Sequence, residues 1–347
     1  MMDQHPAIRH WSDLETRDPG NFFGTDEPMG LGAAFGAHFG LKRIGIHHMR
    51  LLPGRRTSLP HAESHEQEFV HVVSGTPDVW LDGQIYRLAA GDSVGFAPGT
   101  GLAHSFLNNT ASEVCLIVVG DSDNDANRIV YPVNPERRAI RTDWWHDAPS
   151  RPLGAHDGLS DQRRAALGLG GRATPVPGPH DTIAHWNAIE NPVPWQYDQH
   201  DEPMGYNAAL GHHFRLTRLG IHHQRLLPGR RTSFPHAESA EDEFVFVIAG
   251  TPDVWLDGDV HRLRQGDGVG FPAGTGLCHS FINNTDGVVQ LLVVGDTAMP
   301  VNRILYPLNP ERQAMRKDWW ADAPDRPHGP HDGLSDLRRT ELGPRKD

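Results

Sequence analysis

The residues of this chain most able to do chemistry are histidines and glutamates that occur twice with the same spacing. Each set has the pattern His-x-Glu-x4-Glu, and a further histidine follows 36 residues after the last glutamate. Two histidines with one carboxylate form the facial arrangement of non-haem iron oxygenases, and imidazole with carboxylate also suits zinc and manganese. We therefore expect up to one divalent metal ion (zinc, iron or manganese) at each set. The candidate ligands are His61, Glu63, Glu68 and His104 in the first set and His236, Glu238, Glu243 and His279 in the second.

The first set falls in segments whose alternation is typical of β-strands. Residues two apart in a strand share a face, so His61 and Glu63 are expected to point the same way. Glu68 shares its face with the apolar Val70, and His104 lies between two apolar neighbours of the same face. These side chains would point into an apolar interior, where an uncompensated carboxylate is costly. A metal ion would supply the compensation, and a buried network of ion pairs and hydrogen bonds is the alternative.

The two sets belong to a tandem repeat that covers almost the whole chain. Residues 10–167 return as residues 185–342 at a constant offset of 175 without a gap, and residues 51–58 return unchanged at 226–233. Two copies of this size indicate two domains by duplication. A Gly/Pro-rich stretch between them is typical of an exposed linker. The predicted organisation is a first domain at 1–170, a linker at 171–180 and a second domain at 181–347.

The centre of each copy carries the signals of short strands. Residues 68–74 are rich in β-branched and aromatic side chains, and residues 114–119 form a continuous apolar run. Asp82-Gly83 predicts a hairpin with a type I′ turn. Many short strands separated by turns favour a sandwich or a barrel. The tail of each copy is expected to pack on the barrel as an arm, with a short helix and with tryptophans as anchors.

The two His/Glu blocks resemble the paired motifs of the cupin superfamily. The first cupin motif has the form G-x5-H-x-H-x(3,4)-E-x6-G and the second G-x5-P-x-G-x2-H-x3-N, and the centre of each half is similar to both. The resemblance implies an all-β fold class, with two tandem double-stranded β-helix (cupin or jelly-roll-like) barrels and short helical or irregular extensions. By this resemblance the metal ligands are His61, Glu68 and His104, and again His236, Glu243 and His279.

The chain departs from the cupin pattern at several positions. Gly54 and Gly229 stand one residue further from the first histidine than the pattern asks, and Pro98 and Pro272 sit one and two positions early. Glu63 and Glu238 stand where the motif has its second histidine. Each glutamate could be a fourth ligand, which would give a site of two histidines and two carboxylates, or could act as a catalytic base. Because one fold hosts many activities, the resemblance does not transfer the chemistry of any particular cupin.

Three further pairs of matched residues are candidates for binding a substrate. The histidine pairs at 47–48 and 222–223 lie on a predicted strand, so only one of each pair can face a cavity. An arginine in the loop before the first motif could hold a carboxylate through two parallel hydrogen bonds, or could make a surface ion pair instead. The substrate-binding candidates are His47, Arg56 and Asn108 in the first half and His222, Arg231 and Asn283 in the second.

The composition of the chain excludes some classes of binding partner. The net charge of −12 makes nucleic acid and anionic membranes poor partners. No apolar run approaches the roughly 20 residues that a membrane helix needs. The two cysteines, Cys115 and Cys278, are not matched between the copies, and the N-terminus lacks the features of a signal peptide. We therefore expect a cytoplasmic protein whose partner is a small-molecule substrate, and the sequence leaves open a homodimer.

Together these features predict a metal-dependent enzyme acting on a small organic substrate, with dioxygenase-like chemistry favoured. A zinc- or manganese-dependent isomerase or lyase is the first alternative, in which the metal polarises a carbonyl group. A non-enzymatic binding protein for a sugar or a small acid is the second. The copies need not bind the same ligand, because residues around the blocks differ; His71, for example, aligns with Phe246.

Overall fold

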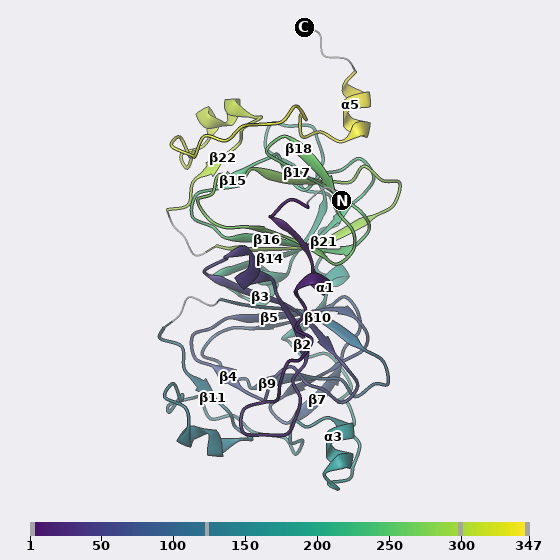
Figure 1. Cartoon of the computed structure of the whole chain (residues 1–347), viewed down its shortest axis with the longest axis vertical. Coiled ribbons are helices and arrows are strands. Elements are labelled where there is room, and N and C mark those ends of the chain that lie inside the picture. The colour runs from purple at the N-terminus through teal and green to yellow at the C-terminus, as the bar shows by residue number, and fades with distance from the viewer. Residues whose placement is uncertain (1–3, 122–124, 298–300, 344–347) are drawn as a thin grey trace.

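The computed structural model describes residues 4–121, 125–297 and 301–343, and every structural statement below concerns these residues. Two β-rich halves are stacked along the long axis of the molecule (Figure 1). The expected all-β architecture of two tandem barrels with short helical extensions is confirmed. Among the described helices, none has the length and apolar character needed to span a membrane.

The elements of the first half are short. Its strands are β1 (Ile8–His10), β2 (Leu31–Ala34), β3 (Ile44–Leu51), β4 (Ala62–Glu63), β5 (Glu68–Ser74), β6 (Asp78–Leu81), β7 (Gln84–Arg87), β8 (Asp92–Phe96), β9 (His104–Leu107), β10 (Val114–Asp121) and β11 (Ile129–Val130). Its helices are α1 (Trp11–Leu14), α2 (Phe35–Phe39), the 3-10 helix η1 (Pro135–Ala139) and α3 (Asp161–Ala166).

The second half repeats this order. Its strands are β12 (Ile183–His185), β13 (Tyr206–Ala209), β14 (Leu219–Leu226), β15 (Ala237–Glu238), β16 (Glu243–Ala249), β17 (Asp253–Leu256), β18 (Asp259–Arg262), β19 (Asp267–Phe271), β20 (His279–Ile282), β21 (Val289–Asp296) and β22 (Ile304–Leu305). Its helices are the 3-10 helices η2 (Trp186–Ala188) and η3 (Pro310–Met315), with α4 (Leu210–His213) and α5 (Asp336–Leu342).

Each barrel is built from a large and a small antiparallel sheet. The orders in the first half are β12-β8-β5-β10-β3-β2 and β7-β6-β9, and those in the second are β1-β19-β16-β21-β14-β13 and β18-β17-β20. Alternating apolar side chains fill the space between the two sheets, and Val70 and Val72 of β5 lie in one buried cluster with Phe106 of β9. The strand predicted at residues 68–74 is therefore confirmed, as is the inward face on which Glu68 was placed.

The hairpin predicted around Asp82-Gly83 is formed by β6 and β7. Both turn residues have positive φ, 45° at Asp82 and 85° at Gly83, as a type I′ turn requires. The turn also docks the tail, because the backbone N–H of Gly154 donates to the Asp82 carbonyl at 2.7 Å. A Cβ added at Gly83 would meet the Gly154 backbone at 2.4 Å, so glycine is required here for contact as well as for conformation.

The first strand of each half joins the large sheet of the other half. β1 pairs with β19 of the second half, and β12 pairs with β8 of the first. Ile8 lies in the core of the second barrel, while Ile183 packs on the core of the first. Each of these two short strands therefore belongs to one half by sequence and to the large sheet of the other half by pairing. A strand pairs with the free sheet edge that lies beside it in space, and the offset of a repeat carries no information about that edge.

The two halves pack through the outer faces of their large sheets, which lie back to back in the middle of Figure 1. The ring of Phe35 lies 5.1 Å from that of Phe244, and the ring of Phe69 lies 6.1 Å from that of Phe214. All four belong to one buried apolar cluster made of residues from both halves. The halves therefore share a third hydrophobic core, and burial of this apolar surface holds them together.

Two matched arginines also link each half to a loop of the other. Arg43 of the first half binds the Asp296 carboxylate and the backbone carbonyl of Ala240. Arg218 of the second half binds Asp121 and the carbonyl of the matched residue, His65. The two loops directly precede β5 and β16, the strands that open with a candidate metal ligand. The packing of the halves is therefore connected to the segments that position those ligands.

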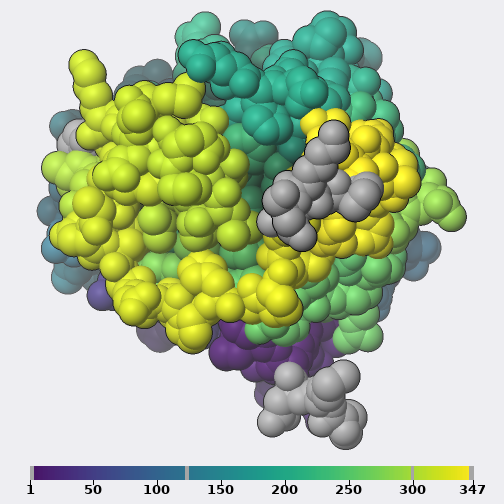
Figure 2. Space-filling view, turned by 90° about the horizontal axis from the view of Figure 1, so that it is seen from above, coloured from purple at the N-terminus to yellow at the C-terminus, as the bar shows by residue number. Residues whose placement is uncertain are grey.

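The tails pack on the barrels as arms, as the sequence predicts. In the first half η1 begins at Pro135, and Trp145 is buried in a cluster with Trp80. In the second half the leader and the tail, teal and yellow-green in Figure 2, cover the end of the barrel side by side. Arg338 of α5 there forms an ion pair with Asp201 of the leader. The leader and the tail are thus held to each other at that end of the barrel.

Candidate metal centres

Three of the predicted ligands converge inside the first barrel. His61, Glu68 and His104 each offer one ligand atom, and these atoms lie within 4.8 Å of one another. The Glu68 carboxylate lies 3.7 Å from Nε2 of His61 and 3.0 Å from Nε2 of His104. The centroids of the two imidazole rings are 4.8 Å apart. Two imidazoles and one carboxylate thus point at a single place.

The second barrel has a matching triad. The ligand atoms of His236, Glu243 and His279 also lie within 4.8 Å of one another. The two imidazole centroids are again 4.8 Å apart, and Oε2 of Glu243 lies 3.3 Å from Nε2 of His279. The candidate site is therefore duplicated in space as it is in the sequence.

Backbone pairing brings the two histidines of a triad together. His61 and His104 oppose each other in an antiparallel bridge, where their backbone N–H groups donate to each other's carbonyls at 3.2 and 2.9 Å. Side chains of such opposed residues are neighbours. Nδ1 lies 2.9 Å from the Leu59 carbonyl in His61 and 3.3 Å from the Leu102 carbonyl in His104. A proton on Nδ1 suits these contacts and leaves Nε2 of each ring to bind a metal.

The donor set of the first triad fits a divalent cation. Oε2 of Glu68 is buried without a well-aligned hydrogen bond, although Nε2 of His104 lies only 3.0 Å away. Burial alone would raise the pKa of Glu68, but His104 and His61 hold that pKa well below its usual range. Burial would lower the pKa of His61, and the hydrogen bond and charge of Glu68 outweigh it and raise the pKa to about 9. An ionised carboxylate between two imidazoles is a set that a cation would complete.

The fourth predicted ligand, Glu63, lies beside the first triad. Its Oε1 is 3.8 Å from Nε2 of His61, and its Oε2 accepts a hydrogen bond from the Asn127 side-chain amide. Burial, together with the negative charge of Glu68, raises the pKa of Glu63 to about 7. The carboxyl group therefore changes its protonation state near neutral pH, which suits proton transfer beside a metal site.

Glu238 has the matching asparagine partner in the second half. Asn302 donates a hydrogen bond to its Oε2 at 2.5 Å. Burial and the negative charge of Glu243 raise the pKa of Glu238 to about 8. The asparagines at 127 and 302 were not predicted, because they follow the barrel strands in a segment without periodicity.

A further glutamate near each triad was also missed. Asn127 donates to Glu66 at 3.3 Å as well as to Glu63, so that one amide joins two carboxyl groups. Burial and the charge of Glu68 raise the pKa of Glu66 to about 8, and burial with the charge of Glu243 raises that of the matched Glu241 to about 7. These glutamates lie in polar turns, where the alternation that revealed the other residues does not operate.

The histidine pairs divide between two faces, as expected from strand alternation. His47 shares its face of β3 with Met49, which packs on the core of the first barrel. His48 lies on the other face, buried between the halves with its ring 4.6 Å from that of Trp11. In the second half Nδ1 of His222 lies 3.1 Å from a side-chain oxygen of the leader strand β13. His47 and His222 therefore take the barrel-facing side, although neither lines the cavities described below.

The loop arginines have a different role from both roles predicted for them. Arg56 is 3% exposed and forms an ion pair with Glu27 at 2.6 Å, while its other terminal nitrogen donates to the Gly158 carbonyl at 2.7 Å. Arg231 is equally buried and makes two hydrogen bonds to Glu202 at 2.7 and 2.6 Å. Neither guanidinium lies on the surface or next to a triad. Both hold the leader to the tail, so we no longer assign them to substrate binding.

The motif asparagines, which were predicted to bind a substrate, make their hydrogen bonds within the protein. Asn108 is fully buried, and its amide donates to the carbonyls of Leu51 and Ser112 at 2.8 Å. Its side-chain oxygen accepts from the backbone N–H and the hydroxyl of Thr110 at 3.0 and 2.7 Å. Asn283 makes the same set of bonds in the second half. Every hydrogen-bonding position of these amides is occupied by the protein, so they fasten a turn.

Cavities border both triads, but they differ in volume and in the triad members that line them. A cavity of about 220 Å³ in the second barrel is lined by all three members of the second triad. A cavity of about 380 Å³ in the first half has His61 as the one member of the first triad among its lining residues. Its other lining residues include Phe22, Phe23, Tyr131 and Arg137. All three members of the second triad thus line one cavity, whereas the cavity beside the first triad has one triad member in its lining.

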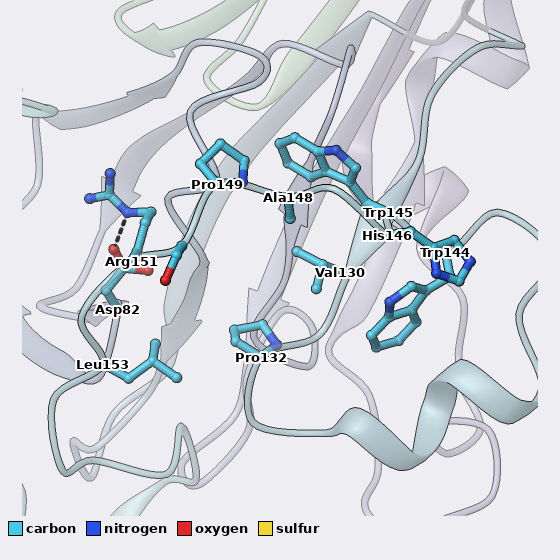
Figure 3. A pocket seen from close by; sticks show the side chains of 12 residues that line it. Asp82, Val130, Pro132, Trp144, Trp145, His146, Ala148, Pro149, Arg151 and Leu153 are labelled. Atoms are coloured by element: carbon cyan, nitrogen blue, oxygen red, sulfur yellow. Dashed lines mark hydrogen bonds and ion pairs between the residues drawn. The ribbon is translucent and has the colours of Figure 1, made fainter.

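A separate cavity of about 320 Å³ lies on the tail of the first half. Figure 3 shows Trp144, Trp145 and His146 on one side of it, and Arg151 in an ion pair with Asp82 on the other. No triad residue is part of its lining. His146 corresponds to an alanine in the second copy, so this part of the lining is not duplicated.

The cupin domain family model matches the chain twice, at residues 47–120 and 222–295. These two segments contain both triads and most of the strands of both barrels. The chain therefore contains two cupin domains, one in each half, and has the duplicated organisation of a bicupin.

Solved structures of other bicupins have the same overall fold. A mutant salicylate 1,2-dioxygenase from Pseudoaminobacter salicylatoxidans, in complex with gentisate, is 17% identical, with a TM-score of 0.56 over 86% of this chain and 84% of that chain. The oxalate decarboxylase of Lactobacillus farciminis, in a formate complex, is 14% identical, with a TM-score of 0.51 over 89% and 90%. That of Bacillus subtilis, described with Mn(II) centres, is 14% identical, with a TM-score of 0.51 over 92% and 87%. No curated protein matches the sequence.

Proposed function

We propose that this bicupin is a metal-dependent enzyme acting on a small organic molecule, with dioxygenase-like chemistry at non-haem iron. The observation that carries the proposal is the His/Glu/His triad present in each barrel. Two imidazoles and one carboxylate occupy one face of a metal ion and leave the opposite face for a substrate and O₂. The similarity in fold to a salicylate 1,2-dioxygenase supports the same choice.

The residues in and around each triad would have different roles. In the first half the metal would be held by Nε2 of His61, Nε2 of His104 and the carboxylate of Glu68, and bound iron would supply electron-transfer chemistry with O₂. Glu63 would accept or return a proton at the edge of the site, because its pKa is raised to about 7. Phe96 stacks on the His104 ring at 3.6 Å and keeps that side of the ligand free of water.

A zinc- or manganese-dependent isomerase or lyase is the second candidate. It is favoured by the additional carboxyl groups, since the pKa values of both Glu63 and Glu66 are raised towards neutrality. Two groups able to exchange protons suit a reaction that moves protons without net oxidation. The metal would then supply Lewis-acid polarisation of a carbonyl group.

The first test is the metal content per chain, measured by plasma mass spectrometry on untagged protein purified without added metal. The proposal expects one to two equivalents, lowered by His61→Ala and by His236→Ala. Oxygen uptake by the iron-loaded protein is then measured across a panel of aromatic acids and diketones. Iron with substrate-dependent uptake supports the dioxygenase, and zinc or manganese with turnover but no uptake supports the isomerase or lyase. Metal without turnover leaves the non-enzymatic binding protein, and no metal even on titration overturns the proposal.

A further inference from the structure

The leader and the tail of the first half enclose a cavity that lies apart from the metal triads. We call it the leader–tail cavity; its volume is about 370 Å³, within the range of small-molecule sites. It lies at the end of the first barrel that carries α3 (Figure 1), and the leader loop before β2, the 3-10 helix η1 and α3 all contribute to its lining. In the described part of the chain, no residue of either triad lines it. It is therefore a candidate for a second kind of site.

The leader–tail cavity is bordered by apolar side chains that the protein leaves uncovered. Phe23 is 76% exposed, Ile140 58% and Leu167 49%, whereas Leu59, which also lines the cavity, is buried. Exposed apolar side chains gathered around one hollow are typical of binding sites, because a ligand that covers them removes apolar surface from water. The cavity therefore suits a ligand with an apolar body.

Two arginines of the lining have hydrogen-bonding capacity left for a ligand. Arg137 donates from Nη2 to the Phe23 carbonyl at 2.7 Å, and among the described residues its Nε and Nη1 have no acceptor. Arg163 pairs with Asp26, whose side chain is 81% exposed, and such exposed pairs are weak. Both guanidinium groups can therefore pair with an anion bound between them.

The charge of the lining also favours an anion. Arg56 and Glu27 neutralise each other in a buried ion pair at 2.6 Å. The other charged residues of the lining are Arg137, Arg163 and the exposed Glu136. The leader–tail cavity thus has an excess of positive charge in a chain whose net charge is −12. An anion bound there would be paired with the protein, so its desolvation would be compensated.

The matched arginine of the second half is closed off by aromatic rings. Arg312, matched to Arg137, is 8% exposed, and its guanidinium lies 4.4 to 5.4 Å from three ring centroids. One of these rings is that of Phe234, and the first half has Leu59 at that position. Arg137 is half-buried and lies near one ring, that of Tyr131 at 5.5 Å. The smaller leucine therefore leaves the arginine of the first half accessible.

The apolar border is likewise a property of the first half. Asp198 stands in the second half where Phe23 stands in the first. Arg338, matched to Arg163, forms two ion pairs instead of one. A carboxylate at position 198 would repel an anion, and the arginine beside it is already neutralised. The second half therefore provides a matched control that lacks these features.

We propose that the leader–tail cavity binds a small amphipathic anion, a carboxylate with an aliphatic body. Its charge pairs with Arg137 and Arg163, and its body lies against Phe23, Ile140 and Leu167. The inference goes beyond the proposed function, because the cavity shares no residue with either triad in the described chain. It assigns the first half a second ligand that the second half does not bind.

The leader–tail cavity adjoins the cavity beside the first triad. Phe23 and Arg137 line both, and the other cavity also includes His61. A ligand in the leader–tail cavity would therefore contact part of the wall of its neighbour. Arg163 lines the leader–tail cavity alone, and Asn21 lines the neighbouring cavity alone. Substitutions at these two positions therefore distinguish the two locations.

Calorimetric titration of the full chain tests the inference, with octanoate as the probe. Octanamide has nearly the same body without the charge, and acetate has the charge without the body. We expect one octanoate per chain, with octanamide and acetate each binding at least ten-fold more weakly. Arg137→Gln should weaken octanoate about ten-fold, since a hydrogen bond to a charged group is lost, and should leave octanamide unchanged.

Further variants locate the bound octanoate. Arg163→Gln should weaken it a few-fold, whereas Asn21→Ala should leave its affinity unchanged. Phe23→Asp, which copies the second half, should abolish binding, because an apolar contact is replaced by a like charge. Asp198→Phe is the matched control and should change nothing. Positions 23 and 198 are both exposed, and the thermal midpoint of every variant is measured, so that misfolding is recognised directly.

Several results would overturn the inference without affecting the proposed function. They are the absence of octanoate binding, equal affinity for octanoate and octanamide, and an octanoate affinity that depends on Asn21 and not on Arg163. A wild-type dimer that Phe23→Asp dissociates in sedimentation velocity would show that a second copy covers the apolar border, and would overturn it too. Loss of octanoate binding in Phe23→Asp and its weakening in Arg137→Gln, at unchanged thermal midpoints, support the inference.

Discussion

The two barrels of this chain agree in their metal triads and differ in what surrounds them. The imidazole centroids are 4.8 Å apart in both halves. The second triad lines a cavity together with Trp195, Tyr197 and Gln224, whereas His61 of the first triad lines a cavity together with Phe22, Phe23 and Tyr131. On the proposed function, holding a metal and recognising a substrate would therefore depend on separate residues. After duplication, the residues that recognise the substrate can change while the metal ligands are kept.

The largest expected effect comes from removing one triad ligand in each barrel in turn. Replacement of His104 or His279 by alanine leaves two of three ligands and should abolish metal binding in that barrel alone. Metal content measured by plasma mass spectrometry should fall by one equivalent in each single variant and reach zero in the double variant. If one single variant lost no metal, the two triads would not be functionally equivalent, however similar their geometry.

The buried ion pairs offer the next comparison. Arg231 makes two hydrogen bonds to Glu202, whereas Arg56 makes one to Glu27 and leaves Oε1 of that glutamate buried without a partner. Removing one member of a buried pair costs about 3–5 kcal/mol. Glu202→Ala should therefore lower the free energy of unfolding by about that amount, and Glu27→Ala by less. Urea unfolding of both variants measures the difference, and an equal loss would show that the second hydrogen bond adds nothing.

Acid stability should distinguish the halves at position 71, where the second half has Phe246. His71 is 1% exposed, with Nδ1 2.9 Å from the Ser93 hydroxyl, and burial with the nearby His223 lowers its pKa to about 3. Between pH 6.5 and about 3, the imidazole of His71 is protonated in the unfolded chain and neutral in the folded chain. Lowering the pH through this range therefore favours the unfolded chain and reduces the free energy of unfolding. Between pH 7 and pH 5, His71 is expected to lower the free energy of unfolding by about 2 kcal/mol.

His71→Phe, which copies the second half, should therefore reduce the difference between the urea midpoints measured at pH 7 and pH 5. Ser93→Ala serves as the control, because it removes the hydroxyl partner and leaves the titrating ring in place. A pH dependence identical to that of the wild type in His71→Phe would place the acid sensitivity elsewhere.

The smallest expected effect concerns the arginines that cross between the halves. Arg43 binds the loop before Glu243, and Arg218 binds the loop before Glu68. Coupling through packed elements is worth about 0.5–2 kcal/mol. Arg43→Gln should therefore weaken metal binding in the second barrel by a few-fold and spare the first, and Arg218→Gln should do the reverse. Competition with a chelator, in chains that keep one intact triad, measures the metal affinity of each site separately. Equal weakening of both sites would indicate that the whole structure has become less rigid.

Much of the fold and half of the candidate site could be predicted, because the sequence repeats in tandem and its side chains alternate between the two faces of each strand. The spacing of His61, Glu68 and His104 placed three ligands on inward faces, and the structure brings them together. The hairpin turn at Asp82 was predicted from local chemistry alone. The role of Arg56 was not, because its partner Glu27 lies far away in the sequence, in a leader without periodic pattern.

The sequence by itself determined the duplication, the strands and the two metal triads, since these depend on local spacing and on which residues share the face of a strand. The tertiary structure alone decided which sheet each leading strand joins and which side chains complete each cavity. β1 and β12 pair across the halves because the free sheet edges meet there in space. Trp195 reaches the second triad from a leader about 40 residues upstream of His236, and such contacts depend on how the chain folds back, which spacing along the sequence does not encode.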